Sequence, residues 1–210
     1  MQLVLASTSP RRRELLALLG VSFQVHPPAF EEHPLAGLAP RDQVGYFALE
    51  KARSVADRRP GDLVLGSDTV IELDGRLLGK PRDYVEARDM LTALAGRPHE
   101  VHTAVALCSR IRAVESVEMA TAMVSIRPDV DGAIERYLAT GESLGKAGAY
   151  SIQGAGGDLV ERIEGDFTTV VGLPLTVVAR LLGSVQYPVP RNVAEIYREK
   201  PYPNWSRFAR

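Results

Sequence analysis

The chain has 210 residues, 45% of them hydrophobic, which suffices for one large globular domain or two small ones that share a cleft. Its 25 basic and 26 acidic residues almost cancel, so no strong overall field would attract nucleic acid or an anionic membrane, and we expect neither as a partner. The single cysteine, Cys108, excludes a disulfide framework and a metal site built from several thiolates.

Two further features concern location and reactivity. Cys108 lies in an apolar run, which favours a structural thiol over a nucleophile. The apolar start, residues 1–6, is too short for the core of a signal peptide, and no segment approaches a membrane span. The sequence therefore predicts a cytoplasmic protein.

The N-terminal segment predicts a strand, a hydroxyl-rich loop and a helix. Residues 3–6 read as a short buried strand, Ser9 suits a helix N-cap, Pro10 suits the first helical position and Gly20 suits the stop. The loop carries Ser7, Thr8 and Ser9, and three arginines, residues 11–13, follow. Hydroxyls, guanidinium groups and the positive end of a helix dipole favour a phosphate chain. The alternative is a capped surface helix with solvated arginines.

The next segment places an acid beside a predicted hairpin. A helix over residues 41–56 precedes two strand segments, 63–66 and 70–73, which flank Ser67-Asp68-Thr69. Asp74-Gly75 indicates a hairpin, and Lys80 follows it. An acid at a strand end can hold a divalent cation or accept a proton from water, and a lysine across the hairpin can meet phosphate oxygens. The alternative is that Asp68 and Thr69 form an ordinary turn.

The remaining chain alternates helices and strands, which predicts an α/β fold. His99 and His102 could place two ligands on one strand, but no other histidine or cysteine stands near them in the sequence, so we expect no zinc site. From Tyr187 onward no period is visible, and we expect a domain over residues 1–186 with a peripheral extension over 187–210. The other predicted elements are helices at 84–95, 129–140 and 173–182 and strands at 100–108, 116–126 and 159–163.

A glycine-rich segment, residues 145–157, predicts a backbone that approaches a ligand closely. Within it, the amide of Gln153 offers a donor and an acceptor. This pair suits the edge of uracil or thymine, whereas a guanine edge with two adjacent donors would prefer a carboxylate. The alternative is a tight loop with a surface glutamine.

Together these segments resemble the Maf family, also called septum-formation inhibitors. The resemblance rests on residues 5–16, 66–70, 79–81, 146–154 and 170–175, and it spans nearly the whole chain except the tail. It implies an elongated mixed β-sheet flanked by helices, with two lobes and a central cleft, as in the inosine triphosphate pyrophosphatases. It also implies cleavage between the α and β phosphates of a nucleoside triphosphate, a divalent cation, Mg²⁺ or Mn²⁺, as cofactor, and a homodimer.

The resemblance assigns roles to individual residues. It makes Asp68 the proton acceptor and a metal ligand, Lys80 a second catalytic residue, and Glu31 a metal-associated acid. Phosphate-facing or polar substrate contacts fall on Ser7, Arg12 and Lys51. Arg11, Thr69 and Gln153 match the branch that hydrolyses dTTP and UTP, whereas the 7-methyl-GTP branch carries Trp, Gln and Glu there.

The expected activity is therefore hydrolysis of dTTP and UTP to the monophosphate and pyrophosphate. Three alternatives stay open at this point: a 7-methyl-GTP pyrophosphatase, another phosphatase or nucleotidyl transferase, and a nucleotide-binding regulator of cell division with little turnover.

Overall fold

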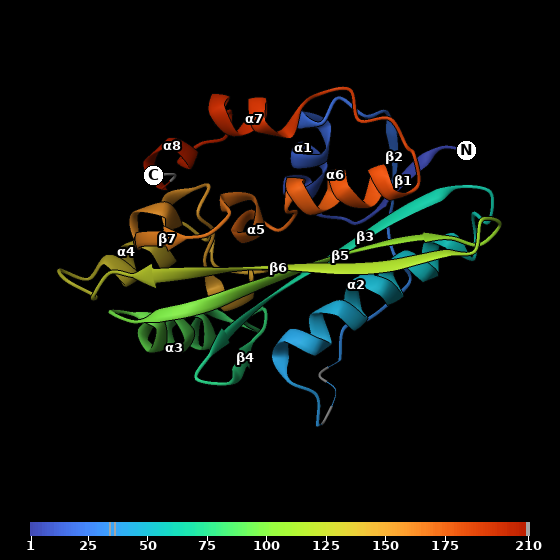
Figure 1. Cartoon of the computed structure of the whole chain (residues 1–210). Coiled ribbons are helices and arrows are strands. Elements are labelled where there is room, and N and C mark those ends of the chain that lie inside the picture. The colour runs from blue at the N-terminus through green and yellow to red at the C-terminus, as the bar shows by residue number, and fades with distance from the viewer. Residues whose placement is uncertain (34, 36, 209–210) are drawn as a thin grey trace.

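The computed structural model describes residues 1–33, 35 and 37–208, and a long mixed β-sheet dominates it (Figure 1). The strands follow the order β2-β1-β3-β5-β6-β7, and β4 pairs with β3. Strand β1 is parallel to β2 and β3, whereas β3, β5, β6 and β7 pair antiparallel. The strands are β1 (Leu3–Ala6), β2 (Phe23–His26), β3 (Leu63–Leu73), β4 (Arg76–Leu78), β5 (Pro98–Ser109), β6 (Val114–Ile126) and β7 (Val160–Glu164). The predicted α/β fold with an elongated mixed sheet is confirmed.

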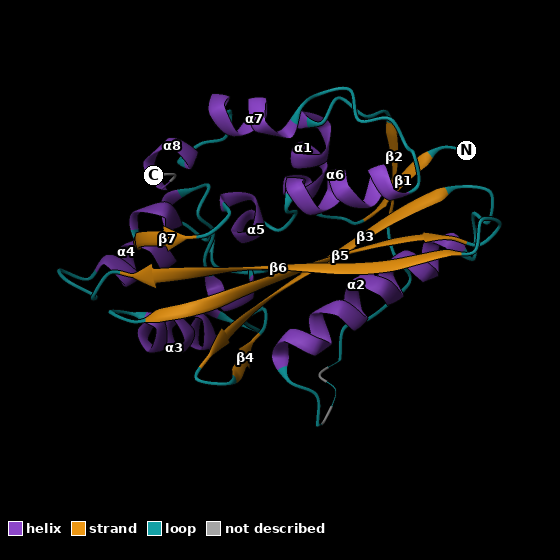
Figure 2. Cartoon of the chain, in the orientation of Figure 1, coloured by secondary structure: helices purple, strands orange, loops and turns teal. Residues whose placement is uncertain are grey.

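Helices flank this sheet on both sides, as the secondary-structure colouring shows (Figure 2). Helix α2 lies against one side, and α1, α5, α6 and α7 lie on the other. The helices are α1 (Pro10–Leu18), α2 (Pro40–Ala56), α3 (Tyr84–Leu94), α4 (Ala133–Leu138), α5 (Phe167–Val171), α6 (Leu175–Ser184), α7 (Val193–Glu199) and α8 (Trp205–Phe208). Two short 3₁₀ turns, η1 (Ala147–Ala149) and η2 (Ala155–Asp158), occupy the glycine-rich segment.

Helix α2 approaches the sheet closely at Gly66. Its apolar face repeats every three or four residues, with Val44, Ala48 and Ala52 packed on β1, β3 and β5. A Cβ atom added at Gly66 would lie 2.3 Å from the carbonyl oxygen of Ala48, so a larger residue would force the helix away. The close approach brings Lys51 of α2 against the next part of β3, where Asp68 lies.

Strand β3 differs from its prediction. The sequence indicates two strand segments separated by Ser67-Asp68-Thr69, but these residues lie inside one strand of eleven residues. They pair in register with three residues of β5, Val105, Ala104 and Thr103. The backbone N–H and C=O groups therefore pair with β5. The side chains of Ser67, Asp68 and Thr69 contact Gly172, Lys51 and Thr103, respectively. The turn alternative for Asp68 and Thr69 is wrong.

Two predicted helices have different boundaries in the structure, and helix α5 had no predicted counterpart. The helix expected at 129–140 is confined to Ala133–Leu138, and the one expected at 173–182 runs over Leu175–Ser184. Helix α5 was not predicted; it ends at Gly172, which has a φ of 116°. That left-handed conformation favours glycine and turns the chain between α5 and α6.

The segment after Tyr187 contains two short helices and packs on the main body. The indole of Trp205 is 1% exposed and stacks on Phe167 with ring centroids 5.2 Å apart. The hydroxyl of Tyr197 donates to Asp166, 2.7 Å away. The tail thus adds to the hydrophobic core, and the domain boundary at residue 186 stays a prediction.

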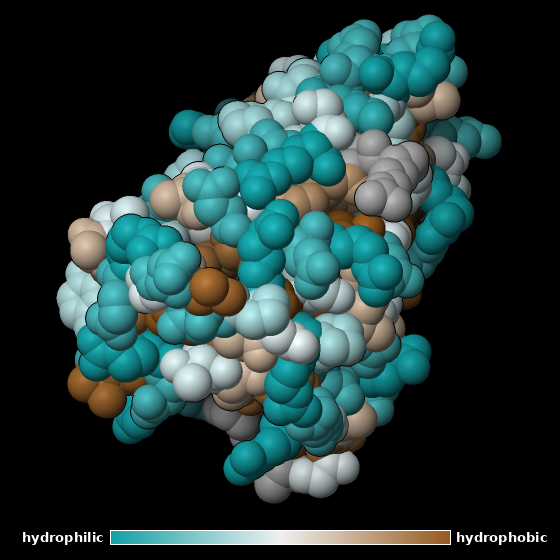
Figure 3. Space-filling view, turned by 90° about the vertical axis from the view of Figure 1, so that its left-hand side faces the viewer, coloured by the Kyte–Doolittle hydropathy of each residue, from teal (hydrophilic) through white to brown (hydrophobic). Residues whose placement is uncertain are grey.

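One face of the molecule is predominantly hydrophilic, with hydrophobic atoms visible in small patches (Figure 3). Among the described residues, no helix combines the length and the apolar character that a membrane crossing requires.

Candidate active site

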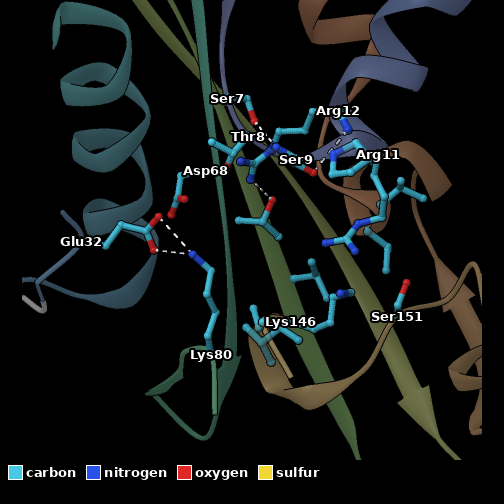
Figure 4. A pocket seen from close by; sticks show the side chains of 18 of the residues that line it. Ser7, Thr8, Ser9, Arg11, Arg12, Glu32, Asp68, Lys80, Lys146 and Ser151 are labelled. Carbon is cyan, nitrogen blue, oxygen red and sulfur yellow. Dashed lines mark hydrogen bonds and ion pairs between the residues drawn. The ribbon is translucent and has the colours of Figure 1, made fainter. Parts of the chain in front are cut away.

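Most of the predicted site residues line one cleft of about 500 Å³. Its walls come from the β1–α1 loop, α2, β3, the residues after β4 and the glycine-rich segment around η1 (Figure 4). The predicted residues that line it are Ser7, Arg11, Arg12, Lys51, Asp68, Thr69 and Lys80. Segments that lie far apart in the sequence therefore meet at one polar cavity.

The β1–α1 loop begins the cleft wall with an ordered helix cap. The hydroxyl of Ser9 accepts from the backbone N–H of Arg12 at 3.5 Å, and the hydroxyl of Ser7 accepts from the N–H of Ser9 at 3.1 Å. Pro10 occupies the first helical turn. The predicted cap is confirmed, and the N-terminus of α1 borders the cleft, where its dipole favours an anion.

The acidic part of the cleft is organised by a buried lysine. Lys51, which is 5% exposed, donates from Nζ to Asp68 Oδ1 and, at 2.5 Å, to Glu32 Oε1. Lys80 lies 3.3 Å from Glu32 Oε2. Two carboxylates and two ammonium groups thus form one network, in which Lys51 and Asp68 are buried.

Asp68 has a perturbed environment. It is 3% exposed, and its Oδ2 atom has no hydrogen-bond partner among the residues that the structure describes. Burial raises the pKa of Asp68, and the neighbouring Lys51 and Arg12 only partly oppose the rise. At Glu32, burial also opposes ionisation, but Lys51 and Lys80 outweigh it, so its pKa is lowered. A carboxylate with a free oxygen and a raised pKa can accept a proton or bind a cation.

The structure brings Glu32, and not Glu31, into the cleft. The side chain of Glu31 is 89% exposed and lies 3.6 Å from His33. Glu32 lines the cleft and contacts both lysines. The sequence offered two adjacent acids in a loop without period, so it could not fix which of them turns inward. The acid that faces the cleft is therefore Glu32, the residue directly after the one assigned from the sequence.

Arg12 is held at two of its nitrogen atoms. Its Nε donates to the carbonyl oxygen of Gly172 at 2.9 Å, and its Nη2 donates to Thr69 Oγ1 at 3.1 Å. Burial lowers the pKa of Arg12, although Asp68 and Glu32 oppose this. The guanidinium is therefore a fixed cation beside the buried acid.

Two further cations face the other end of the cleft. The side chains of Arg11 and Lys146 extend toward the same region, near Ser151 (Figure 4). Burial lowers the pKa of both groups, and a neighbouring cation lowers each further: Arg12 acts on Arg11, and Arg11 acts on Lys146. Within residues 1–33, 35 and 37–208, neither side chain makes a hydrogen bond or an ion pair. These cations are thus available to oxygen atoms of a ligand.

The glycine-rich segment lines the cleft through Tyr150, Ser151 and Ile152, but not through Gln153. Gln153 is half-buried and follows the lining residues directly. The hydroxyl of Tyr150 lies 2.7 Å from Nε2 of His99. Burial lowers the pKa of His99 to about 4, so this histidine is neutral at pH 7 and supports the wall.

Sequence reasoning missed several residues of the site. Lys146 and Ser151 line the cleft and belong to the motif over residues 146–154, but no role was assigned to them from the sequence. The glycine-rich backbone was the signal that could have included Lys146 and Ser151.

His102 lies in a different polar group, away from the cleft lining. Its Nε2 lies 3.2 Å from Glu72 and 3.6 Å from Glu100, and its Nδ1 lies 2.8 Å from the hydroxyl of Thr121. The three ligand atoms of Glu72, Glu100 and His102 lie within 4.8 Å of one another. Sequence reasoning considered only histidines and cysteines as further ligands and overlooked these glutamates. Both ring nitrogens of His102 have protein partners, Thr121 and Glu72.

An anion-favouring helix N-terminus, a buried acid and a ring of cations on a mixed α/β sheet define a nucleotide-hydrolase type of site. The sequence profile of the Maf-like protein family matches residues 2–185. The chain belongs to the Maf family, and the resemblance noted from its motifs is confirmed.

Named relatives agree with this placement. A protein of Anaeromyxobacter dehalogenans (strain 2CP-1), named dTTP/UTP pyrophosphatase, is 50% identical over 90% of this chain and 96% of its own length. Proteins of the same name from Myxococcus xanthus and Moorella thermoacetica are 49% and 50% identical, over 90% and 86% of this chain and 94% and 93% of theirs. The solved Ham1 protein of Staphylococcus aureus matches 60% of this chain and 72% of its own, with a TM-score of 0.43 and 16% identity.

Proposed function

We propose that this protein hydrolyses dTTP and UTP to the corresponding monophosphate and pyrophosphate. The observation that carries the proposal is the buried Asp68 carboxylate, with one free oxygen, set among Arg12, Lys51 and Lys80 in a cleft large enough for a nucleotide. The names of the relatives support the choice of substrate.

In the proposed reaction, Asp68 accepts a proton from the water that attacks the anhydride between the α and β phosphates. The water oxygen bonds to phosphorus, the bond to the bridging oxygen breaks, and pyrophosphate leaves with that oxygen. Arg12, Lys51 and Lys80 stabilise the charge that moves onto the leaving group. This role needs fixed cations, and the contacts of Arg12 and Lys51 supply them.

The donor set of the cleft fits a divalent cation. The free Oδ2 of Asp68 and the carboxylate of Glu32 are the oxygen ligands that Mg²⁺ or Mn²⁺ prefers, and phosphate oxygens would complete the coordination. We propose these two residues as its protein ligands, with Glu32 in place of Glu31. When bound, the ion would polarise a phosphoryl group and offset its charge.

We also propose that the base lies at the Arg11, Lys146 and Ser151 end of the cleft. Gln153 directly follows the lining residues of this wall, so a small movement of the segment on binding would bring its amide to the base. The homodimer and the cytoplasmic location stay proposals that rest on the family resemblance.

The test of the function is a substrate panel of UTP, dTTP, GTP and 7-methyl-GTP with product analysis. We expect UTP and dTTP to give the highest kcat/KM, with pyrophosphate rather than orthophosphate released. Gln153→Glu should lower kcat/KM for UTP about ten to a hundredfold, because the proposed contact of the amide with the base would be replaced by a mismatch of about 1 to 3 kcal/mol. Orthophosphate release, a preference for 7-methyl-GTP, or binding without turnover would each reject the proposed activity.

The neighbouring glutamates provide a matched pair of variants. Glu32→Gln removes a charge that contacts Lys51 and Lys80, so kcat should fall at least about tenfold and the Mg²⁺ concentration for half-maximal rate should rise. Glu31→Gln removes the same charge from an exposed position and should leave both values within about twofold. Equal effects of the two variants would exclude Glu32 as the inward-facing acid.

A further inference from the structure

A chain of hydroxyl groups runs beneath Arg12. Thr69 of β3 and Thr103 of β5 are partners in register, and their Oγ1 atoms lie 2.9 Å apart. Thr103 is 0% exposed, and its hydroxyl lies 2.7 Å from the carbonyl oxygen of Thr169 in α5. At the other end, Arg12 Nη2 lies 3.1 Å from the Thr69 hydroxyl.

The chemistry at the two ends fixes the direction of every bond in this chain. The carbonyl of Thr169 can only accept, so Thr103 donates its single proton to it. Thr103 must then accept the proton of Thr69. A guanidinium has no acceptor, so Arg12 donates to Thr69. The hydroxyl of Thr69 thus donates its only proton to Thr103 and accepts a hydrogen bond from Arg12 through a lone pair.

A second anchor completes the arrangement. The carbonyl oxygen of Gly172 accepts from Arg12 Nε at 2.9 Å and from the hydroxyl of Ser67 at 3.1 Å. Two of the five N–H donors of Arg12 are therefore held by protein acceptors, and the other three are left for phosphate oxygens. Because Thr169 and Gly172 belong to the same turn of chain, α5 supports both anchors.

We propose that Thr103 is a positioning residue for Arg12. It fixes the hydroxyl of Thr69 as an acceptor, and Thr69 acts on the nucleotide through the guanidinium instead of donating to the base. The inference rests on the proposed function only in that Arg12 meets phosphate oxygens.

The test compares Thr103→Val, which keeps the shape but removes the hydroxyl, with Thr103→Ser, which keeps it. We expect kcat/KM for UTP to fall about tenfold in the valine variant and to recover to within about threefold in the serine variant. The loss should be similar for UTP, dTTP and GTP, since phosphates are common to all three. Ser109→Ala is the matched control, because Ser109 is buried on the same strand and its hydroxyl has no partner among the described residues.

A double-mutant cycle with Arg12 distinguishes a positioning role of Thr103 from a general loss of stability. In an Arg12→Ala background, Thr103→Val should change kcat/KM by less than about twofold, because the group that it positions is gone. Thermal midpoints of all variants are measured alongside. If Thr103→Val does not fold, Thr69→Val removes the same link from its other end and should show the same coupling to Arg12.

Affinity for inorganic pyrophosphate, measured by calorimetry, tests the inference without turnover. This affinity should fall in Thr103→Val and recover in Thr103→Ser even if no tested nucleotide is hydrolysed. Failure of the proposed hydrolysis can therefore be distinguished from failure of the inference about Thr103. Unchanged pyrophosphate binding in Thr103→Val, a loss that persists in full without Arg12, or a loss confined to one base would overturn the proposal.

Discussion

Replacing Asp68 by asparagine should lower kcat for UTP at least a hundredfold, while the protein still folds. The amide keeps the shape of the side chain but accepts no proton from water and binds Mg²⁺ poorly, and general-base roles are typically worth about a hundredfold or more. The thermal midpoint should fall, because the buried ammonium of Lys51 is left with Glu32 as its charged partner after its pair with Asp68 is lost. Retention of more than about a tenth of the activity would remove Asp68 from the centre of the mechanism.

The pH profile provides an independent reading of the same residue. Burial raises the pKa of Asp68, so the carboxylate that accepts the proton is lost, and with it activity, as the pH falls through this raised value. In the metal-free protein the titration of Asp68 should therefore lie above the ordinary aspartate pKa of about 3.9, and a bound divalent cation should move it to lower pH. A titration of Asp68 at or below that value in the metal-free protein would contradict the environment described for this carboxylate.

Replacing Lys51 by methionine should produce the second large effect, on both stability and the pH profile. Lys51 is buried and binds Asp68 and Glu32, so its removal leaves carboxylates without their principal cation. Breaking such a pair typically costs about 3 to 5 kcal/mol in the free energy of unfolding. The pKa of Asp68 should rise further, because the cation that favours its ionised form is gone, and the acid limb of kcat should move to higher pH.

Lys80→Met is the control for this variant. It also removes one positive charge from the network, but Lys80 is 57% exposed and its ammonium pairs with Glu32 at 3.3 Å. Its free energy of unfolding should change by less than about 0.5 kcal/mol, although kcat/KM falls for every nucleotide through the phosphates. If Lys51→Met were no less stable than Lys80→Met, the buried ion pair would not be what holds Asp68 in place.

Local patterns predicted the elements better than the cleft between them. The caps of α1, the apolar face of α2 and the hairpin at Asp74-Gly75 are read from neighbouring residues, and each is present. The break expected at Asp68 is absent because polar residues inside a strand look like a turn until the partner strand is known. In the structure, the backbone groups of these residues pair with β5. The partner residues lie about 35 positions further along the chain, so local sequence does not reveal the pairing.

The site shows the same division between local and distant information. Motif resemblance located Ser7, Arg12, Asp68 and Lys80, because each stands in a distinctive short pattern. It assigned Glu31, whereas the structure turns Glu32 inward, because both acids lie in a loop and their contacts with distant lysines distinguish them. The role of Gly66 likewise becomes visible only when α2 is packed against it.

The packing of the C-terminal segment has a practical consequence. Trp205 is the only tryptophan of the chain, and it is buried against Phe167 at the start of α5 and beside Tyr197 of α7. Helix α5 carries the carbonyl of Thr169 and leads directly to that of Gly172, the acceptors beneath Arg12. Intrinsic indole fluorescence therefore comes from one site, next to the element that supports the phosphate end of the cleft. The fluorescence of Trp205 can therefore be recorded during nucleotide titration to detect changes around α5 without any added label.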